Sequence, residues 1–594
     1  MRIADCGLRL VQAVPSLSSG GLRWVLCGSV LVLATTSAQT PIPVTVRVDL
    51  SREVGDLPPV WAFFGYDEPN YTYMKDGRKL LSQLAALSPV PVYIRAHNLL
   101  TSGDGTPALK WGSTNAYTED AQGRPRYDWT IVDRIFDTYV ERGMRPLVEI
   151  GFMPEALTTG PPPYRHGFSV EKPSDIFTGW AYPPKDYSRW AELVHQWVRH
   201  TVERYGHDEV DTWLWEVWNE PNIGYWKGTP EEYHKLYDYS VDAVKRALPS
   251  ARVGGPHSTG PGNAKARGFL QAFLEHCARG KNYATGATGA PLDFIAFHAK
   301  GRPEVIDGHV RMGISSQLTD IDQGFATVAS FPKWKNTPIV IGESDPEGCA
   351  ACSARVYKQN GYRNGTMYSS YTAATFPRKY ELAKRHGVRL LGIVTWAFEF
   401  EDQPWFDGFR DLATNGIDKP VLNVFRLFGM MRGRQVAAES SAAASVDDMV
   451  HTGVRSAPDV GVLAARIVHS GTPVAGGRPM ARILFWHYHD DDVPGPAATV
   501  DLTIDGLPQS ITSAQVGQFC IDENHSNSYA AWKAMGSPAA VSDTQYAALE
   551  EAARLTLCPT PGSRPVTSGT MTARFELPRQ GVSMVDVSWV EDPR

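Results

Sequence analysis

The stretch Trp213-Leu-Trp-Glu-Val-Trp-Asn-Glu-Pro-Asn222 decides how the rest of this chain is interpreted. Its residues alternate as in a pleated strand, and the strand ends at Pro221 because proline cannot donate a ladder hydrogen bond. The carboxyl group of Glu220 is thereby left at the end of a strand, among aromatic rings that raise a carboxyl pKa. Such a group can act as a general acid near neutral pH. The alternative is a buried glutamate that pairs with an arginine at the rim of a barrel.

Short apolar strands alternate with amphipathic helical stretches on both sides of this segment, from about residue 44 to residue 430. The strands are near-continuous apolar runs, which is typical of strands covered on both faces. Eight such alternations predict an α/β fold, a (β/α)8 TIM barrel. The predicted strands are 60–65, 92–97, 145–151, 212–218, 252–255, 293–298, 338–343 and 390–396, and the predicted helices include 131–142, 187–205, 231–247 and 366–386.

Polar side chains stand where these apolar runs stop, and barrel enzymes carry their chemistry at that face. A single charge at a rim is usually only solvated, but polar groups recur at nearly all of the predicted strand ends. We therefore predict an active site at the carboxyl end of the barrel. The residues are Arg95, His97, Glu149, Asn219, Glu220, His257, His298, Lys300, Glu343 and Trp396.

The sequence changes character around residues 436–448, where small and polar residues show little pattern. Beyond this stretch the helical periods largely vanish, and strand-like runs between turn residues predict a C-terminal antiparallel β-sandwich. We predict a catalytic barrel over residues 39–435 and a β-sandwich accessory domain over residues 436–594. The alternating segment 44–50 could pair with the sandwich.

Residues 1–38 are expected to be a signal peptide, with cleavage near Ala38. Arg23 precedes an apolar run that is too short for a comfortable membrane span, and small residues follow it. We therefore expect a secreted or periplasmic protein that has no membrane contact after cleavage.

Seven cysteines are present, and two of them lie in the predicted signal peptide. Cys349 and Cys352 have metal-ligand spacing, but no second pair completes a tetrahedral site. We expect a local disulfide or two free thiols there. Cys520 and Cys558 could form a second bridge, and one cysteine of the remaining five must stay unpaired in a monomer.

A second carboxyl group, that of Glu343, ends the predicted strand 338–343 across the barrel mouth from Glu220. A separation of about 5–5.5 Å between two such groups implies a retaining double displacement, and about 6.5–9.5 Å implies inversion. In the retaining case Glu343 attacks the anomeric carbon, while Glu220 protonates the leaving oxygen and then activates water. The alternative for Glu343 is a structural ion pair with Arg95 or Lys300.

The composition excludes other classes of function. The net charge is -6 at pH 7, so the chain has no basic excess that would hold a nucleic acid. The chemistry above needs neither a metal nor an organic cofactor. An oligosaccharide or glycoside is the expected partner, and the sequence leaves a homo-oligomer open.

Several motifs resemble a known family over nearly the whole chain that follows the predicted signal peptide. Asn219-Glu220 and Glu343, at the ends of predicted strands four and seven, are typical of the clan of retaining (β/α)8 glycosidases. Within that clan the chain resembles glycoside hydrolase family 39, which contains β-xylosidases and α-L-iduronidases. The other matching pieces are Tyr93-Ile-Arg-Ala-His97, Pro183-Pro-Lys-Asp-Tyr187, Phe294-Ile-Ala-Phe-His298, Trp486-His-Tyr-His-Asp490 and Asp522-Glu-Asn-His-Ser-Asn527.

The resemblance implies a role for each matching position. Glu220 would be the acid/base, Glu343 the nucleophile, and Asn219 a partner of the sugar 2-hydroxyl. The remaining residues would contact the sugar: His97 and His298 in the −1 site, Trp396 as part of its floor, Trp180 from the loop after strand three, and Glu401 and Asp402 at its hydroxyl groups.

One departure concerns the choice of sugar. After His298-Ala299 the xylosidases usually carry an aromatic residue, whereas this chain has Lys300. That lysine is similar to the one that faces a uronate carboxylate in the iduronidases, where it would form a charge-assisted hydrogen bond. The alternative is that Lys300 pairs with a nearby acid such as Asp402.

The leading hypothesis is a secreted retaining exo-glycosidase that removes terminal β-D-xylosyl residues from xylo-oligosaccharides or other xylosides. The same machinery acting on an α-L-iduronide, another uronide or another pentopyranoside is the second hypothesis. A non-catalytic carbohydrate-binding protein on a barrel is the third, and it would bind sugar without turnover.

Overall fold

The structure, a computed structural model, describes residues 40–590 apart from 88–89, 172–175, 397, 468–479 and 559–561. The predicted signal peptide, residues 1–38, lies outside the described residues. Within the described part of the chain, no helix is both long and apolar enough to cross a membrane.

Eight parallel strands close into a barrel, which confirms the predicted fold. The strands are short, because each apolar run stops where its polar residues begin. Going around the barrel they are β2 (Phe63–Tyr66), β3 (Tyr93–Ala96), β6 (Arg145–Ile150), β7 (Leu214–Val217), β8 (Arg252–Ser258), β9 (Phe294–Phe297), β12 (Ile339–Ile341) and β13 (Leu390–Trp396).

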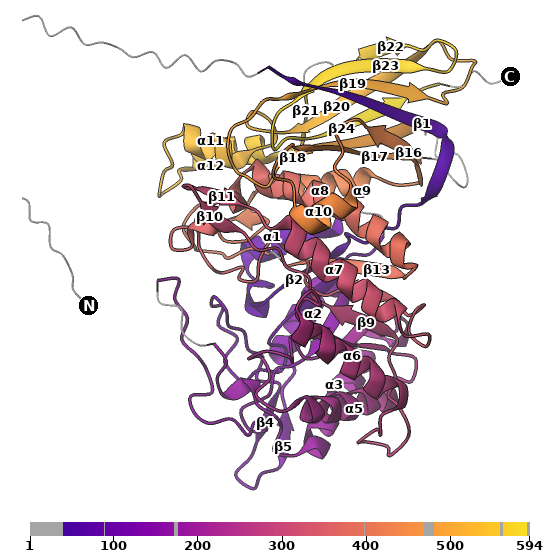
Figure 1. The fold of residues 1–594 in the computed structure, drawn as a ribbon. Coiled ribbons are helices and arrows are strands. Elements are labelled where there is room, and N and C mark those ends of the chain that lie inside the picture. Colours follow the sequence, from indigo (N-terminus) through magenta and orange to yellow (C-terminus); the bar gives the residue numbers. More distant parts are fainter. Residues whose placement is uncertain are drawn as a thin grey trace, which may run out of the picture. The chain divides into compact units, whose positions relative to one another are not determined.

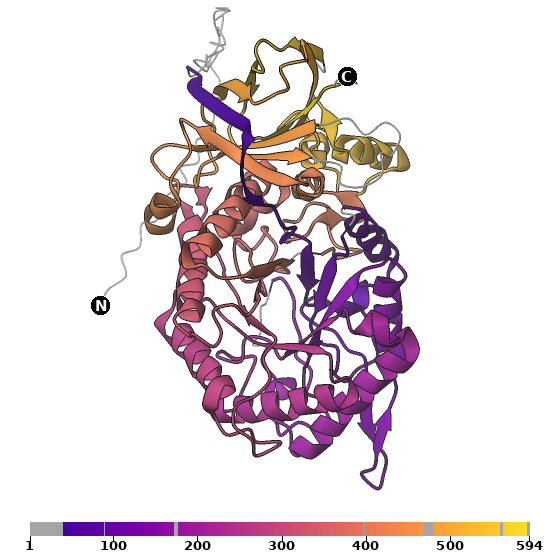
Figure 2. The same cartoon turned by 90° about the vertical axis from the view of Figure 1, so that its right-hand side faces the viewer.

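One helix follows each barrel strand, and Figure 2 shows these helices as a ring outside the strands. Local signals fix their ends: the side chain of Asp186 caps the first turn of the third helix, and Thr229 and Glu232 form a capping box on the next long one. The eight helices are α1 (Lys75–Ala85), α2 (Thr130–Val140), α3 (Tyr187–Tyr205), α5 (Pro230–Ala247), α6 (Ala264–Arg279), α7 (Ile314–Ala329), α8 (Thr366–His386) and α9 (Pro420–Met430).

Short elements decorate the loops between these strands and helices. They are η1 (Pro69–Tyr71), η2 (Gly179–Ala181), η3 (Lys358–Asn364), α4 (His207–Val210), and the hairpins β4 (Tyr117–Glu119) with β5 (Pro125–Tyr127), β10 (Glu304–Ile306) with β11 (His309–Arg311), and β14 (Ala413–Thr414) with β15 (Ile417–Asp418).

The second domain is built on a curled, mostly antiparallel sheet with ten described strands, in agreement with the C-terminal antiparallel β-domain that the sequence predicts. Its path runs β21-β20-β24-β18-β17-β16-β1-β19-β23, and β22 pairs with β20. The strands are β1 (Ile42–Asp56), β16 (Arg434–Ser440), β17 (Asp459–Ile467), β18 (Met480–Tyr488), β19 (Ala498–Asp505), β20 (Ser513–Ile521), β21 (Thr556–Leu557), β22 (Gly562–Pro565), β23 (Met571–Leu577) and β24 (Val582–Ser588).

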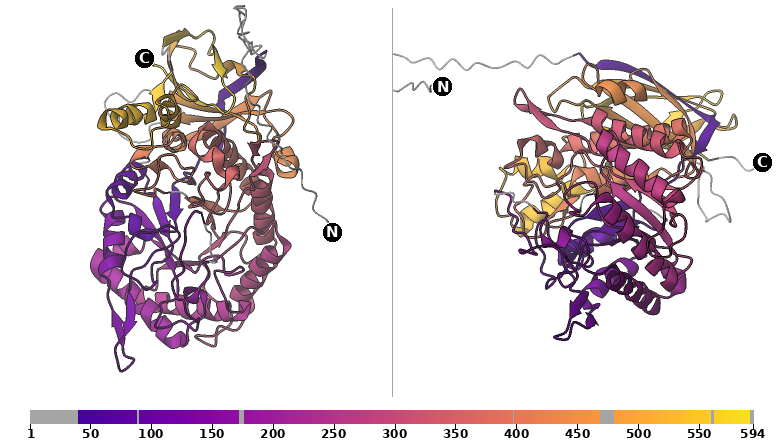
Figure 3. Two further views of the ribbon diagram at one scale, coloured as in Figure 1. Left: turned by 90° about the vertical axis from the view of Figure 1, so that its left-hand side faces the viewer. Right: turned by 60° about the horizontal axis from the view of Figure 1, so that its bottom comes forward.

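The first strand of the chain belongs to this second domain. β1 pairs antiparallel with β16 and parallel with β19, so it lies between two strands from the C-terminal part (Figure 1 and Figure 3). Residues 44–50 therefore lie in the sheet. The described part of this domain also contains helices that the sequence did not reveal, α10 (Val446–Thr452), α11 (Ser528–Ala534) and α12 (Asp543–Ala553).

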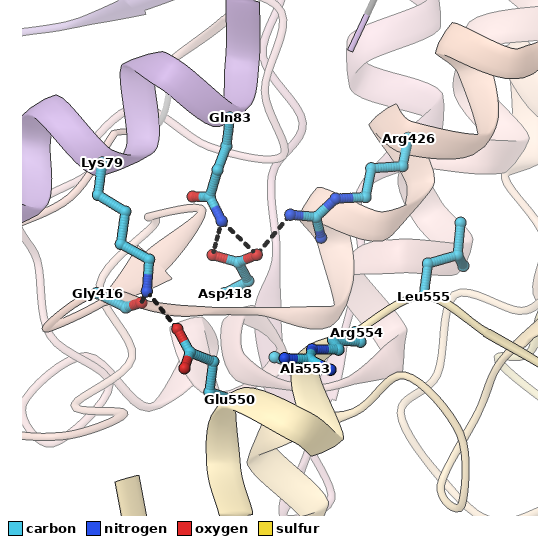
Figure 4. A pocket seen from close by; sticks show the side chains of 9 residues that line it. All are labelled: Lys79, Gln83, Gly416, Asp418, Arg426, Glu550, Ala553, Arg554 and Leu555. Carbon is cyan, nitrogen blue, oxygen red and sulfur yellow. Dashed lines mark hydrogen bonds and ion pairs between the residues drawn. The ribbon is translucent and has the colours of Figure 1, made fainter. Parts of the chain in front are cut away.

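A polar cavity lies where α1 and α9 of the barrel meet α12 of the second domain (Figure 4). Lys79 forms an ion pair with Glu550 at 2.9 Å, and Asp418 accepts hydrogen bonds from Gln83 and pairs with Arg426. These ion pairs are partly exposed, and pairs of that kind contribute about 0–1 kcal/mol each.

Two disulfides are present among the described residues. Cys349 is bonded to Cys352 and Cys520 to Cys558, while Cys277 is a free, buried thiol. The first disulfide closes a small loop after β12, and the second ties the end of β20 to the segment that follows β21.

Candidate active site

The polar residues predicted at the strand ends converge on one buried arginine. Arg95 on β3 lies 2.9 Å from Glu149 on β6, 2.5 Å from Glu216 on β7 and 3.1 Å from Glu343 beyond β12. It also donates to the Asn219 side-chain oxygen at 3.0 Å. Burial lowers the pKa of the Arg95 guanidinium, but the surrounding carboxylates raise it by more than burial lowers it. Arg95 therefore remains charged. This guanidinium ties four strands together beneath the barrel mouth.

The two candidate catalytic carboxylates face each other above Arg95. One carboxylate oxygen of Glu220, one of Glu343 and a ring nitrogen of His298 all lie within 4.8 Å of one another. His298 Nδ1 is 2.9 Å from Glu220 Oε1 and 3.8 Å from Glu343 Oε1. A histidine thus bridges the pair, as expected for residues that contact the same reacting group.

Glu343 is surrounded by cations. Lys300 Nζ lies 2.5 Å from its Oε2, and Arg95 and His97 approach its Oε1 at 3.1 and 3.5 Å. Burial alone would raise the pKa of Glu343, but the charges of Lys300, His298 and Arg95 and a hydrogen bond from His97 hold it well below its usual value. Glu343 is therefore ionised at neutral pH, the form that a nucleophile requires.

The backbone at the end of β7 departs from ordinary strand geometry. Trp218 and Glu220 have φ values of 70° and 41°, a left-handed conformation that L-residues rarely adopt. The Glu220 amide donates to the carbonyl oxygen of His257 at 2.9 Å, and His257 itself has a φ of 51°. Strain of this kind persists where surrounding structure fixes it and is concentrated at active sites.

Aromatic and imidazole rings form the wall beside the nucleophile. His97 is fixed by Glu149, 2.5 Å from its Nδ1, and although burial lowers the pKa of His97, Glu149 and Glu343 raise it to about 9. The Trp396 ring lies 4.4 Å from the His97 ring. A Cβ at Gly65 would stand 2.3 Å from Trp396, so glycine lets this tryptophan lie against β2.

Trp180 on η2 lines a small cavity together with His97, Phe152 and Tyr225. Its ring centroid is 4.4 Å from that of Phe152 and 5.8 Å from that of Tyr225. Ten residues were expected to act on or contact the sugar, and the structure brings eight of them together: Glu220, Glu343, His97, Asn219, His298, Lys300, Trp396 and Trp180.

Glu401 and Asp402 lie elsewhere. Glu401 accepts a hydrogen bond from the Asp76 amide at the start of α1, and Asp402 is exposed in a turn where its amide donates to Asn415. Among the described residues neither forms a hydrogen bond or ion pair with the other predicted site residues. Lys300 is also not paired with Asp402, because its second partner is Asp345 at 2.7 Å.

Sequence reasoning missed the acid that does lie beside Trp396. Asp67, directly after β2, accepts a hydrogen bond from Trp396 Nε1 at 3.0 Å and forms an ion pair with Lys110. A signal was present: Asp67-Glu68-Pro69 places acids at a strand end just before proline, as Asn219-Glu220-Pro221 does. Tyr225 was also missed, because it follows no strand end directly.

Glu220, His298 and Glu343 are close enough to be considered as ligands of a metal ion. The charge around them opposes it, because Lys300 and Arg95 already occupy both oxygens of Glu343. A cation placed there would have to displace an ammonium and a guanidinium. The cluster is therefore poorly suited to a metal ion.

A closed (β/α)8 barrel that carries two facing carboxylates at its carboxyl end has the architecture of a glycoside hydrolase. The chain belongs to the glycosyl hydrolases family 39, whose sequence profile matches residues 44–563. It is therefore a glycoside hydrolase, as the resemblance implies.

Relatives within and beyond bacteria support this assignment. A β-xylosidase of Geobacillus stearothermophilus is 25% identical over 524 residues, covering 84% of this chain and 87% of that protein. An α-L-iduronidase of Mus musculus is 25% identical over 547 residues, covering 86% of this chain and 76% of that protein. A monomeric β-xylosidase structure from Caulobacter crescentus shares the fold at a TM-score of 0.69 and 21% identity, covering 92% of this chain and 100% of that one.

Proposed function

We propose that this protein is a retaining, exo-acting glycosidase that removes terminal β-D-xylosyl residues. The observation that carries the retaining mechanism is the distance between the two carboxylates: an oxygen of Glu220 lies within 4.8 Å of an oxygen of Glu343. Retaining enzymes hold their carboxyl groups about 5–5.5 Å apart, whereas inverting enzymes need room for a water molecule between carboxylate and sugar.

The site supplies both halves of a double displacement. Ionised Glu343 attacks the anomeric carbon while Glu220 gives its proton to the leaving oxygen, so a glycosyl ester forms and the aglycone departs. Water then enters, Glu220 removes its proton, and the ester bond breaks to release the sugar and regenerate the Glu343 carboxylate. His298, 2.9 Å from Glu220, is placed to orient that carboxyl group in both steps.

The state of Lys300 favours a xyloside as the first choice of sugar. Its partly buried ammonium contacts two carboxylates, Glu343 at 2.5 Å and Asp345 at 2.7 Å. A uronate would have to compete with both for the same charge. A xylose ring has no C5 substituent and leaves the pair undisturbed.

A uronide is the second candidate, and a specific observation favours it. Lys300 lies in the catalytic cluster itself, where a carboxylate at C5 could receive a charge-assisted hydrogen bond. The α-L-iduronidase of Mus musculus and the β-xylosidase of Geobacillus stearothermophilus are equally similar to the chain, at 25% identity each.

We also propose that the protein is exported. Two disulfides among the described residues, Cys349–Cys352 and Cys520–Cys558, are typical of an oxidising compartment. The predicted signal peptide agrees with this location, and N-terminal sequencing of the exported protein tests it.

The experiment is hydrolysis of a panel by the wild type, Glu220→Ala and Glu343→Ala. The substrates are aryl β-D-xylopyranoside, aryl α-L-iduronide and aryl β-D-glucuronide. We expect the wild type to cleave the xyloside and to release β-xylose first, which NMR observes directly. The rate of Glu220→Ala on a substrate with a poor leaving group should fall roughly 10²- to 10⁴-fold. Azide should restore turnover and give the β-glycosyl azide as the product.

Each alternative gives a different pattern. With azide, Glu343→Ala should produce the α-glycosyl azide. Azide then takes the place of the missing carboxylate and attacks the anomeric carbon from the face opposite the leaving group. Preference for a uronide would make Lys300 the carboxylate anchor and overturn the xyloside. Sugar binding without turnover of any substrate by the folded wild type would indicate a carbohydrate-binding protein instead.

A further inference from the structure

A small cavity lies beside the catalytic carboxylates, and its wall carries an ion pair that the double displacement does not use. Asp67 and Lys110 line it together with His97, Trp180 and Tyr225. Asp67 comes directly after β2, and Lys110 comes from the long loop after β3. Both side chains are more than nine-tenths buried, with exposures of 6% and 8%.

The surroundings hold this pair in place. The Asp67 carboxylate accepts from Trp396 Nε1 at 3.0 Å while it contacts the ammonium of Lys110. The Lys110 amide donates to Glu68 Oε1 at 2.7 Å, and its backbone has a φ of 56°. Lys110 is therefore fixed through both its main chain and its side chain, whereas a lysine that only balances charge needs no such support.

Asp67 and the nucleophile Glu343 lie next to the same ring nitrogen of His97. His97 Nε2 lies 3.5 Å from Glu343 Oε1 and 3.3 Å from Asp67 Oδ1. A pyranose ring whose anomeric carbon meets Glu343 is wide enough to bring its far edge to Asp67 and Lys110. That edge carries the 3- and 4-hydroxyl groups, since the 2-hydroxyl adjoins the anomeric carbon on the side assigned to Asn219.

We propose that Lys110 and Asp67 form a clamp for the neighbouring 3- and 4-hydroxyl groups of the terminal sugar. Lys110 has only donors, and ionised Asp67 has only acceptors, so together they bind one hydroxyl as acceptor and the next as donor. Hydrogen bonds to charged groups are stronger than neutral ones, and burial excludes the water that would compete.

The clamp deepens the proposed function and rests on it. A sugar held through both free hydroxyl groups carries no further residue at either position, so the bound unit must be the non-reducing end of its chain. Lys110 and Asp67 thereby account for exo action, and they take the place in the site that the resemblance assigned to Glu401 and Asp402.

The test compares aryl β-D-xylopyranoside with its 3-deoxy and 4-deoxy analogues in the wild type, Lys110→Met and Asp67→Asn. Lys79→Met is the matched control, because Lys79 also forms an ion pair but at the domain junction (Figure 4). We expect wild type and Lys79→Met to lose roughly 10- to 100-fold in kcat/KM on removal of a clamped hydroxyl. In Lys110→Met and Asp67→Asn, kcat/KM for the parent substrate should already be lower by that factor. Removing the hydroxyl group from the substrate should then lower kcat/KM little further.

The outcomes separate the clamp from the proposed function. Equal discrimination by wild type and both clamp variants would show that the pair only supports the loop and would overturn the clamp. If both variants fail to fold, inhibition of the wild type by free sugars tests the clamp instead. If 3-deoxy-xylose and 4-deoxy-xylose inhibit as strongly as xylose, the clamp is overturned. A folded wild type that cleaves none of the parent glycosides overturns the proposed function. If the wild type prefers a uronide, the same comparison is made with that uronide and its 3-deoxy and 4-deoxy analogues.

Discussion

The mouth of the barrel and the interior of the second domain bury side chains of opposite kinds. Beneath the barrel mouth Arg95, Glu149, Glu216 and His257 are fully buried together with Glu343. The core of the curled sheet consists almost entirely of aliphatic residues, among them those of β1, β18, β19 and β24, and its other members are Phe485, Trp589 and Met571. On the outer strand β1 the ion pairs are exposed, and Arg47 retains 75% of its side-chain exposure; the buried pair of Asp459 on β17 joins the sheet to Arg378 of α8 in the barrel.

This difference separates the residues that stabilise the fold from the residues that carry out its chemistry. Apolar burial in the sheet stabilises by roughly 25 cal/mol per Å² and needs no partner geometry. Buried charges cost desolvation, which their mutual attraction repays only when every member is paired. A charge network buried at the carboxyl end of a barrel is better explained by chemistry than by stability, and four substitutions test the contrast.

The largest expected effect on stability comes from Arg95→Met, which leaves three buried carboxylates without their shared guanidinium. Removing one member of a buried ion pair costs about 3–5 kcal/mol. Urea unfolding followed by tryptophan fluorescence measures the loss. A cost below about 1 kcal/mol would mean that the carboxylates do not depend on Arg95, and the contrast between the two regions would fail.

A cavity in the sheet should cost nearly as much but leave catalysis intact. Leu502 on β19 is 1% exposed, and Leu→Ala changes in cores cost about 2–5 kcal/mol. We expect Leu502→Ala to lower the unfolding free energy by that amount, with kcat unchanged at a temperature where the variant is folded. A fall in kcat of more than about twofold would show that the sheet positions the site.

Lys300→Met should act on the pH profile. The charge of Lys300 helps to hold the pKa of Glu343 well below its usual value, so Glu343 stays ionised as the pH falls. Without that charge the pKa of Glu343 rises, and the acid limb of kcat/KM should move to higher pH by about one unit or more. Lys79→Met is the control, and an acid limb that stays in place would assign Lys300 to the substrate alone.

The smallest effect is expected for Arg47→Met on the outer face of β1. Arg47 pairs with Asp505 at 3.0 Å in an exposed setting, and such pairs contribute about 0–1 kcal/mol. The same urea titration that follows Arg95→Met provides the comparison. A loss comparable to that of Arg95→Met would contradict the view that only the buried network depends on its partners.

Much of the barrel was predictable because its signals are local. The helix Tyr187–Tyr205 was predicted at its observed bounds, since Asp186 caps its start and Gly206 follows its end. The eight strands were found because polar residues end each apolar run. The short helices α11 and α12 were missed, since two short helices among strands leave little periodic pattern.

The site was predictable in its residues and less so in its pairings. Eight of the ten candidates gather at the barrel mouth, but the sequence could not tell which acid would meet Lys300. Asp345, only two residues beyond Glu343, takes that position because the turn after β12 brings both carboxylates to one ammonium. Glu401 and Asp402 were placed by the family resemblance alone, whereas Asp67 reaches the site from another strand.

The position of β1 in the sheet has a consequence for biosynthesis. β1 (Ile42–Asp56) emerges early, but its partners β16 (Arg434–Ser440) and β19 (Ala498–Asp505) emerge only after the whole barrel has been made. At roughly 5–20 residues per second, an alternating apolar strand waits for tens of seconds with both of its edges unpaired. A nascent chain of this enzyme therefore needs protection at its beginning until its end has been translated, and the barrel cannot be excised at residue 435 without leaving that strand exposed.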